Sequence, residues 1–193
     1  MKSLLTAAVL SGCLCACATS QPDHFYVLSV QPPGESEARA AGATEATLRV
    51  TLPSLVDRSE MILNTSANGI IVLEHERWAA PLSELVAQAL ARDIERRRSD
   101  MLVAEHSVHH STDAIAITVD VVQMTVRRGA RASIETHWRI LDPRTGKDEA
   151  GGELFSAPLA QDGYAGVAQA LSECLGLLAD RLVGQSAMRA RER

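Results

Sequence analysis

The sequence RASIETHWRIL, at residues 131–141, decides the fold class of this chain. Apolar side chains, with one threonine among them, alternate there with polar and charged ones. One face carries Ala132, Ile134, Thr136, Trp138 and Ile140, and the other carries Arg131, Ser133, Glu135, His137 and Arg139. This period of two is typical of a strand with one buried and one wet face, and such strands favour an antiparallel sheet.

Further segments on both sides of this stretch have strand character. Residues 114–126 are largely apolar, and their alternation changes phase near Val121 and Val122, which predicts a β-bulge or a second buried face. A turn at 142–146 leads to a returning strand at 149–156, which Gly151 and Gly152 are expected to weaken. The other predicted strands are 25–30, 48–52, 101–103 and the two arms of a hairpin, 61–63 and 70–73, around the turn dipeptide Asn68-Gly69.

Two segments have the apolar spacing of amphipathic helices. The first, 80–97, has Pro81 in its first turn and basic residues at its end. The second, 163–183, combines a narrow apolar stripe with charged residues, so it is not a membrane span. Residues 31–46 are rich in Pro, Gly, Ala and Glu and predict a loop. The predicted fold is therefore α+β, with a mostly antiparallel sheet covered by two amphipathic helices in a two-layer sandwich.

The N-terminal residues predict a lipid anchor. Lys2 precedes a short apolar segment, and Leu10-Ser11-Gly12-Cys13 matches the bacterial lipobox, in which small residues precede the cysteine that receives diacylglycerol. Leu14-Cys15-Ala16-Cys17 is a looser match, so Cys17 is the alternative acylation site. A plain secretory signal is a further alternative. A membrane span is disfavoured, because the apolar segment is shorter than the ~20 residues that a span requires.

The lipobox also sets the expected domain organisation. Residues 1–12 form a lipoprotein signal peptide that is removed, and 13–24 form the acylated cysteine and its tether. Residues 25–184 form a single domain, and 185–193 a flexible tail. Several acyl chains on one cysteine hold a protein firmly at a membrane, and no cofactor other than this covalent lipid is expected. Asp follows neither cysteine, which favours the periplasmic face of the outer membrane.

The composition argues against some partners. The chain has 19 Lys and Arg against 24 Asp and Glu, a formal net charge of -5, and only two Trp, two Tyr and two Phe. An acidic chain with few aromatic residues is not expected to bind nucleic acid. Three of the four cysteines lie in the signal region, so Cys174 has no partner for an internal disulfide and is expected to be a small core residue.

The sequence contains no recognisable catalytic motif. It lacks G-x-S-x-G, a P-loop, H-E-x-x-H and a glycine-rich dinucleotide fingerprint. No catalytic residue is nominated, and the protein is predicted not to be an enzyme. Asp57 and Arg58 could form a local ion pair, but residue chemistry favours a fixed turn after the strand that ends at Pro53.

Two histidine-containing segments are candidates for metal binding. His106, His109 and His110 have a spacing that could share a metal ion on a helix. Their segment is polar and lies between two predicted strands, which favours a solvated loop, so no metal site is predicted. Glu74-His75-Glu76 is a lesser candidate for metal binding or pH sensing.

An ordered set of motifs gives the clearest functional hypothesis. The motifs are the lipobox, Phe25-Tyr26-Val27-Leu28, Val50-Thr51-Leu52-Pro53 leading to Asp57-Arg58, and Arg77-Trp78-Ala79-Ala80-Pro81-Leu82. In order and spacing they resemble those of the PqiC family, the auxiliary lipoproteins of ABC-type transporters. The resemblance implies a non-enzymatic lipoprotein on the periplasmic face of the outer membrane.

The resemblance also implies partners. Members of that family work with an MCE-domain protein that spans the periplasm as a lipid-conducting tube, or with an ABC permease complex. The lipoprotein is expected to dock the far end of the tube at the outer membrane as a ring-shaped homo-oligomer. By the same resemblance, Cys13 is the acylation site. Asp57, Arg58, Arg77 and Trp78 are family-motif positions with structural or interfacial roles.

Two questions stay open at the level of sequence. Arg77 and Trp78 are of the residue types common at interface hot spots, but they could equally form a packing corner at the start of a helix. The alternative function is a periplasmic lipoprotein that itself binds a lipid or small apolar ligand. Such a protein would need an apolar pocket of several hundred Å³ between its sheet and helices.

Overall fold

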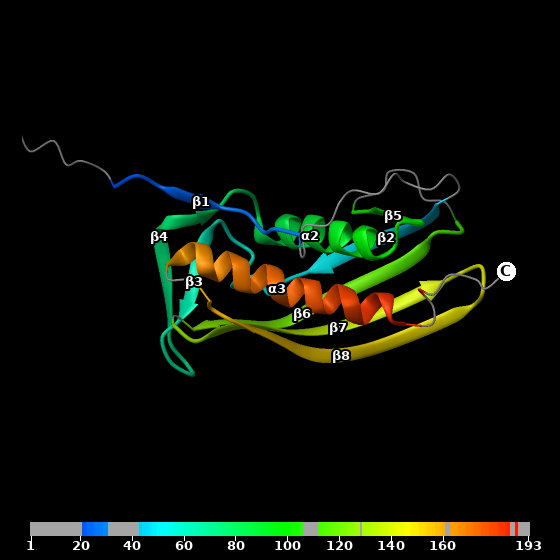
Figure 1. Cartoon of the computed structure of the whole chain (residues 1–193). Helices are drawn as coiled ribbons and strands as arrows, with labels where there is room; N and C mark the ends of the chain where they lie inside the picture. The colour runs from blue at the N-terminus through cyan, green and yellow to red at the C-terminus, as the bar shows by residue number, and fades with distance from the viewer. Residues whose placement is uncertain are drawn as a thin grey trace, which may run out of the picture.

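A five-stranded sheet forms one layer of the structure, and two helices form the other (Figure 1). This computed structural model describes residues 21–30, 43–105, 112–127, 129–160, 163–185 and 188. In spatial order the strands are β5 (Met101–Ala104), β2 (Thr44–Thr51), β6 (Ile115–Arg127), β7 (Arg131–Asp142) and β8 (Lys147–Pro158). Helices α2 (Leu82–Arg97) and α3 (Tyr164–Val183) pack against each other and against the same sheet. The predicted α+β class is confirmed.

The β7 strand alternates as its sequence predicts. Its even-numbered residues from Ala132 to Asp142 are buried, whereas its odd-numbered residues are exposed or half-buried. β7 pairs antiparallel with β6 on one side and with β8 on the other. The register of β6 shifts between Val121 and Gln123, so the phase change in its sequence marks a bulge.

The two glycines of β8 make room for the rings of β7. A Cβ atom at Gly151 would lie 2.3 Å from Cζ2 of Trp138, and one at Gly152 would lie 2.7 Å from Cδ2 of His137. Trp138 is on the buried face and His137 on the exposed face. β8 continues through both glycines from Lys147 to Pro158, so they accommodate neighbouring side chains within an intact strand.

The pairing of β2 differs from the antiparallel pairing of β6, β7 and β8. β2 pairs in parallel with both β5 and β6, which makes the sheet mixed. It also begins at Thr44, inside the segment 31–46 that was predicted to be a loop, so that prediction is wrong for residues 44–46. Ala46 is buried there between two partner strands. Tertiary pairing thus overrides the low strand propensity of alanine.

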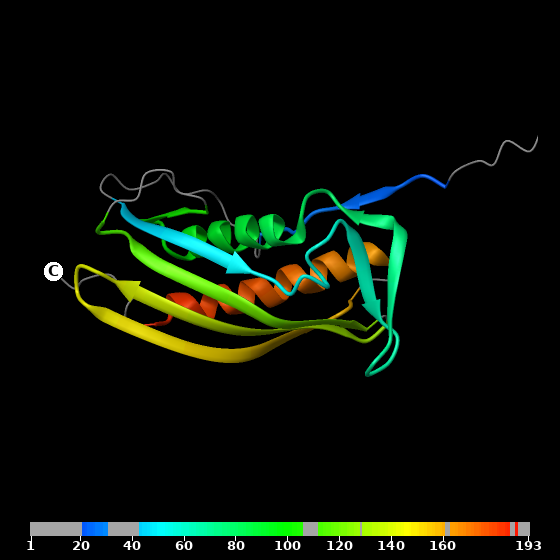
Figure 2. The same ribbon diagram turned by 180° about the vertical axis from the view of Figure 1, so that it is seen from behind.

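A second sheet of three strands stands at one end of the molecule (Figure 2). Its order is β1 (His24–Tyr26), β4 (Ile70–Trp78) and β3 (Glu60–Asn64). β3 and β4 form the predicted hairpin, and β1 pairs in parallel with the other end of β4. β1 is shorter than the predicted strand 25–30, because the chain leaves β4 after Tyr26 and follows α3. The amide N–H of Ser29 donates to Ser172 Oγ over 2.9 Å.

The space between sheet and helices is filled by apolar side chains. Cys174 is part of this core, as expected, and burial raises the pKa of its thiol to about 11. The largest fully buried side chains come from β3, β5, β6, β7 and both helices. Within the described residues, neither helix has the length and apolar character needed to cross a membrane.

Candidate functional site: the corner between the hairpin and helix α2

The structure brings Asp57, Arg58, Arg77 and Trp78 together at one corner of the molecule. The corner consists of residues 53–60, the end of β4 and the first turn of α2. The N–H of Trp78 donates to the carbonyl of Ser59 over 2.7 Å, which fixes the end of β4 against this segment. Because α2 begins at Leu82, the chain passes from hairpin to helix within a few residues.

Asp57 caps helix α2 from a distant part of the sequence. Its Oδ1 accepts a hydrogen bond of 2.9 Å from the backbone N–H of Ser83. The residue at the N-cap position is Pro81, which provides no side-chain cap. A carboxylate at this position also interacts favourably with the positive end of the helix dipole. The favoured turn after Pro53 is present, because the N–H of Asp57 donates to the carbonyl of Pro53 over 3.1 Å. The side chain of Arg58 pairs with Glu60.

Replacing Asp57 by alanine is expected to lower the free energy of unfolding by about 1 kcal/mol, the usual cost of losing an N-cap. Asp57→Asn keeps an oxygen acceptor and should recover most of this loss. Chemical denaturation with circular dichroism measures both values. An alanine variant as stable as the wild type would show that the bond to Ser83 does not contribute to stability.

Glu60 links the two arginines of the corner. Its carboxylate contacts Nε of Arg58 at 2.9 Å and Nη2 of Arg77 at 3.4 Å. Nη2 of Arg77 also donates to Ser59 Oγ over 2.8 Å. The hydrogen bond from Arg58 is the main cause of a lowered pKa at Glu60. Sequence reasoning missed this residue, although an acid two positions after one arginine could have suggested it.

Trp78 is a packing residue of the corner. Its side chain is buried and lines a gap of about 20 Å³ with Leu82 of α2 and Leu171 of α3, among others. This supports the packing alternative for Trp78. A gap of this size is far below what a lipid or drug-sized ligand fills, so the packing around Trp78 does not favour the ligand-binding alternative.

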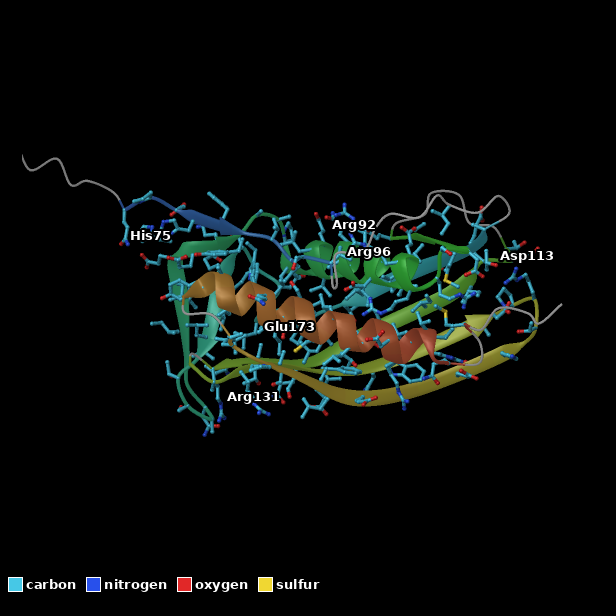
Figure 3. All side chains as sticks on the ribbon, viewed as in Figure 1. His75, Arg92, Arg96, Asp113, Arg131 and Glu173 are labelled. Carbon is cyan, nitrogen blue, oxygen red and sulfur yellow. The ribbon has the colours of Figure 1, made fainter. Side chains whose placement is uncertain are left out.

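A polar cluster fastens β1 to β4 beside the corner. The hydroxyl of Tyr26 donates a hydrogen bond of 2.6 Å to Oε2 of Glu76. The other carboxylate oxygen of Glu76, Oε1, lies 3.0 Å from Nδ1 of His24. His75, the residue before Glu76, is labelled in Figure 3. Its Nδ1 lies 2.9 Å from Oδ1 of Asp23. The described residues include no group of three or more His, Cys, Asp and Glu placed to hold a metal ion. His106, His109 and His110 lie outside the described residues.

Tyr26 is expected to ionise at unusually high pH. Burial, followed by the bond to Glu76, raises the pKa of its hydroxyl from the ordinary value of 10.0 to about 12. Because the folded state holds this proton more tightly, the stabilisation is present below pH 10 and is lost as the pH rises toward 12. The difference in phenolate absorbance between wild type and Tyr26→Phe isolates this titration. A midpoint near 10 would contradict the Tyr26–Glu76 bond.

The surface hollows carry no catalytic constellation. One, of about 750 Å³, is lined by residues of β2, β6 and α2, and another, of about 450 Å³, lies on the outer face of β6, β7 and β8. Both are open, and the described residues that line them include neither His nor Cys. Among the described residues, the arrangement therefore supplies packing and electrostatic contacts, with no assembled nucleophile and base.

Comparison with known structures gives the same fold. A crystal structure of an uncharacterised protein matches with a TM-score of 0.70 and 15% identity, covering 84% of this chain and 97% of that chain. A protein from Xanthomonas campestris matches with a TM-score of 0.61 and 17% identity, covering 83% and 92%. At these identities the likeness concerns the fold alone. None of the curated protein sequences matches.

A family model covers nearly the whole described domain. The model is that of the ABC-type transport auxiliary lipoprotein component, and it matches residues 26–183. These limits run from Tyr26, the last residue of β1, to Val183, the last residue of α3, so both helices and every strand except the first two residues of β1 fall inside the match. The chain therefore belongs to the family of ABC-type transport auxiliary lipoprotein components.

Proposed function

We propose that this protein is a non-enzymatic docking subunit of an ABC-type or MCE-protein lipid transport system, anchored to the periplasmic face of the outer membrane. The single observation that carries the proposal is the family match over residues 26–183. The anchor is the acylated Cys13, with Cys17 as the alternative. Both cysteines lie outside the described residues.

Among the described residues, the cavities support a role in docking better than a role as a carrier. A carrier needs an enclosed apolar chamber for its cargo. The gap beside Trp78 measures about 20 Å³, and the larger hollow of about 750 Å³ is open and partly lined by charged residues. A docking subunit instead needs a rigid domain that presents a surface. The corner has this character, since Arg58 and Arg77 are partly exposed and both are held by Glu60. Arginines fixed in this way are suited to bind carboxylates or aromatic rings of a partner.

The partner is an MCE-domain protein that spans the periplasm, an ABC permease complex, or both. The acidic chain is not suited to nucleic acid, and its contact with the membrane is through the lipid. A homo-oligomer would present several copies of the corner to one partner, so that weak contacts add up. In this proposal the protein holds its partner in place at the membrane and catalyses no reaction.

An affinity pull-down from detergent-solubilised envelopes tests this function. The bait carries a C-terminal tag, and bound proteins are identified by mass spectrometry. The wild type should enrich an MCE-domain protein or an ABC permease, whereas Arg58→Ala with Arg77→Ala should enrich less. Arg92→Ala is the matched control, because Arg92 is an exposed arginine of α2 outside the corner (Figure 3). A bait that retains only itself would overturn the docking function.

Separation of inner and outer membranes tests the location independently. The acylated protein should sediment with the outer membrane, and Cys13→Ala should lose membrane attachment. If Cys17 is the acylation site, only Cys17→Ala will detach the protein. Sedimentation of the wild type with the inner membrane would contradict the proposed location and leave the family assignment unaffected.

A further inference from the structure

The β3–β4 hairpin exposes consecutive apolar side chains at its end. Ile70, Ile71 and Val72 are 43%, 46% and 36% exposed, respectively. We call these residues the hairpin tip. Exposed single apolar residues are ordinary on protein surfaces, but a run of three beside a hairpin turn is not expected without a function. We therefore looked for a surface that could cover these exposed side chains.

The whole hairpin end is free of charge. Residues 61–73 contain no Asp, Glu, Lys or Arg, although charged residues make up 22% of the chain. Its turn contains Asn, Thr, Ser and Gly, and the N–H of Thr65 donates to the carbonyl of Gly69 over 2.9 Å. A segment without charge loses little hydration energy when it enters a partly apolar medium. Hydroxyl and amide groups beside it can bond to lipid headgroups.

The tip and the start of the described chain belong to the same end of the molecule (Figure 1). β1 pairs with residues 76–78 of β4, and the tip lies at the other end of the same strand. From Glu76 to Ile70 is about 20 Å at the usual rise of a strand. The chain from Cys13 to His24 can reach about 38 Å, and from Cys17 about 24 Å. Either anchor therefore lets the tip touch the membrane that holds it.

The size of the tip favours a lipid surface over a second copy of the chain. A stable protein interface buries roughly 800 Å² per partner, and three half-exposed aliphatic side chains supply only a small part of that area. A lipid surface needs less, because the covalent anchor already holds the domain at high local concentration. A few apolar side chains then suffice to keep one end of the domain in the interface.

We propose that the hairpin tip inserts into the surface layer of the membrane to which the chain is anchored. This inference rests on the lipid anchor of the proposed function. The tip and the tether then form two attachments at one end, so the domain stands with a defined end on the membrane. The opposite end, where residues 142–146 join β7 to β8, points away from it (Figure 1).

Tryptophan quenching by lipids tests this contact. The full acylated protein is placed in phosphatidylethanolamine–phosphatidylglycerol vesicles that contain a lipid brominated near the top of its acyl chains. Ile70→Trp reports on the tip, and Val72→Trp is a second reporter if the first variant folds poorly. Leu141→Trp is the matched control, because Leu141 is similarly exposed at 39% but belongs to the end of β7 that adjoins the turn at 142–146. The native Trp78 and Trp138 are buried and give a constant background in all variants.

The tip reporters should lose at least about twofold more emission than the control, because only they enter the interface. Flotation of the same vesicles shows whether the protein is attached. Attached protein with equal quenching at both ends would overturn the insertion of the tip and leave the anchor standing. Protein that does not float with the vesicles would overturn both the anchor and the insertion.

Discussion

Replacing Arg97 by alanine is expected to lower the free energy of unfolding by about 3 kcal/mol, since it breaks a largely buried ion network. Arg97 joins the two helices. Its Nη1 lies 3.2 Å from Oδ1 of Asp93 on α2, and its Nε lies 2.5 Å from Oδ1 of Asp180 on α3. Nη2 also donates to the carbonyl of Gly176 over 3.0 Å. Asp93 is fully buried, so the loss of its cation has a large cost.

Two controls separate this network from general effects of charge. Arg92→Ala removes an exposed arginine from the same helix and should change stability by less than about 0.5 kcal/mol. Asp180→Ala should have an intermediate effect, because Asp180 is 62% exposed while its bonds to Arg97 are lost. Burial acts to lower the pKa of Arg97, but the bonds to Asp180 and Asp93 raise it overall. Equal effects of Arg97→Ala and Arg92→Ala would contradict the network.

Replacing Gly151 by alanine is expected to cost about 2 kcal/mol, in the range of overpacked cores. The new Cβ would lie 2.3 Å from the ring of Trp138, and this ring is buried between sheet and helices. Neither the ring nor the paired strand can move freely, because Trp138 faces Gly151 directly in the register of β7 and β8. Thermal unfolding of the purified domain measures the loss.

The neighbouring glycine provides a matched control. Gly152→Ala would approach His137, whose side chain is on the exposed face and can turn away, so its cost should be smaller. Trp138→Leu in the Gly151→Ala background removes the close approach and should cost less than the two single effects added together. Additive effects would mean that the ring and the glycine do not interact.

The sequence predicts the antiparallel half of the sheet and both helices, because each has a clear period. Strict alternation in 131–141 marks the buried face of β7, and the phase change near Val121 marks the bulge in β6. The parallel pairing of β2 could not be predicted in the same way. A short apolar strand carries no information on the direction of its partners, and residues 44–46 have the composition of a loop.

The candidate site shows a similar limit. The motif positions Asp57, Arg58, Arg77 and Trp78 do converge, but the bonds of Asp57, Arg77 and Trp78 join segments that are 17 or more residues apart in the sequence. Asp57 binds the amide of Ser83, 26 residues away, and not its neighbour Arg58. Adjacent opposite charges suggest a local pair, whereas the free N–H groups at the start of α2 attract the carboxylate more effectively.

The bond between Ser29 and Ser172 constrains the order in which the chain can fold. These residues are 143 positions apart, and Ser172 belongs to the last helix. Contacts of such separation form late, because the intervening chain must be ordered first. The segment that follows β1 therefore gains its hydrogen bond to Ser172 only after α3 has packed, although β1 itself pairs with β4.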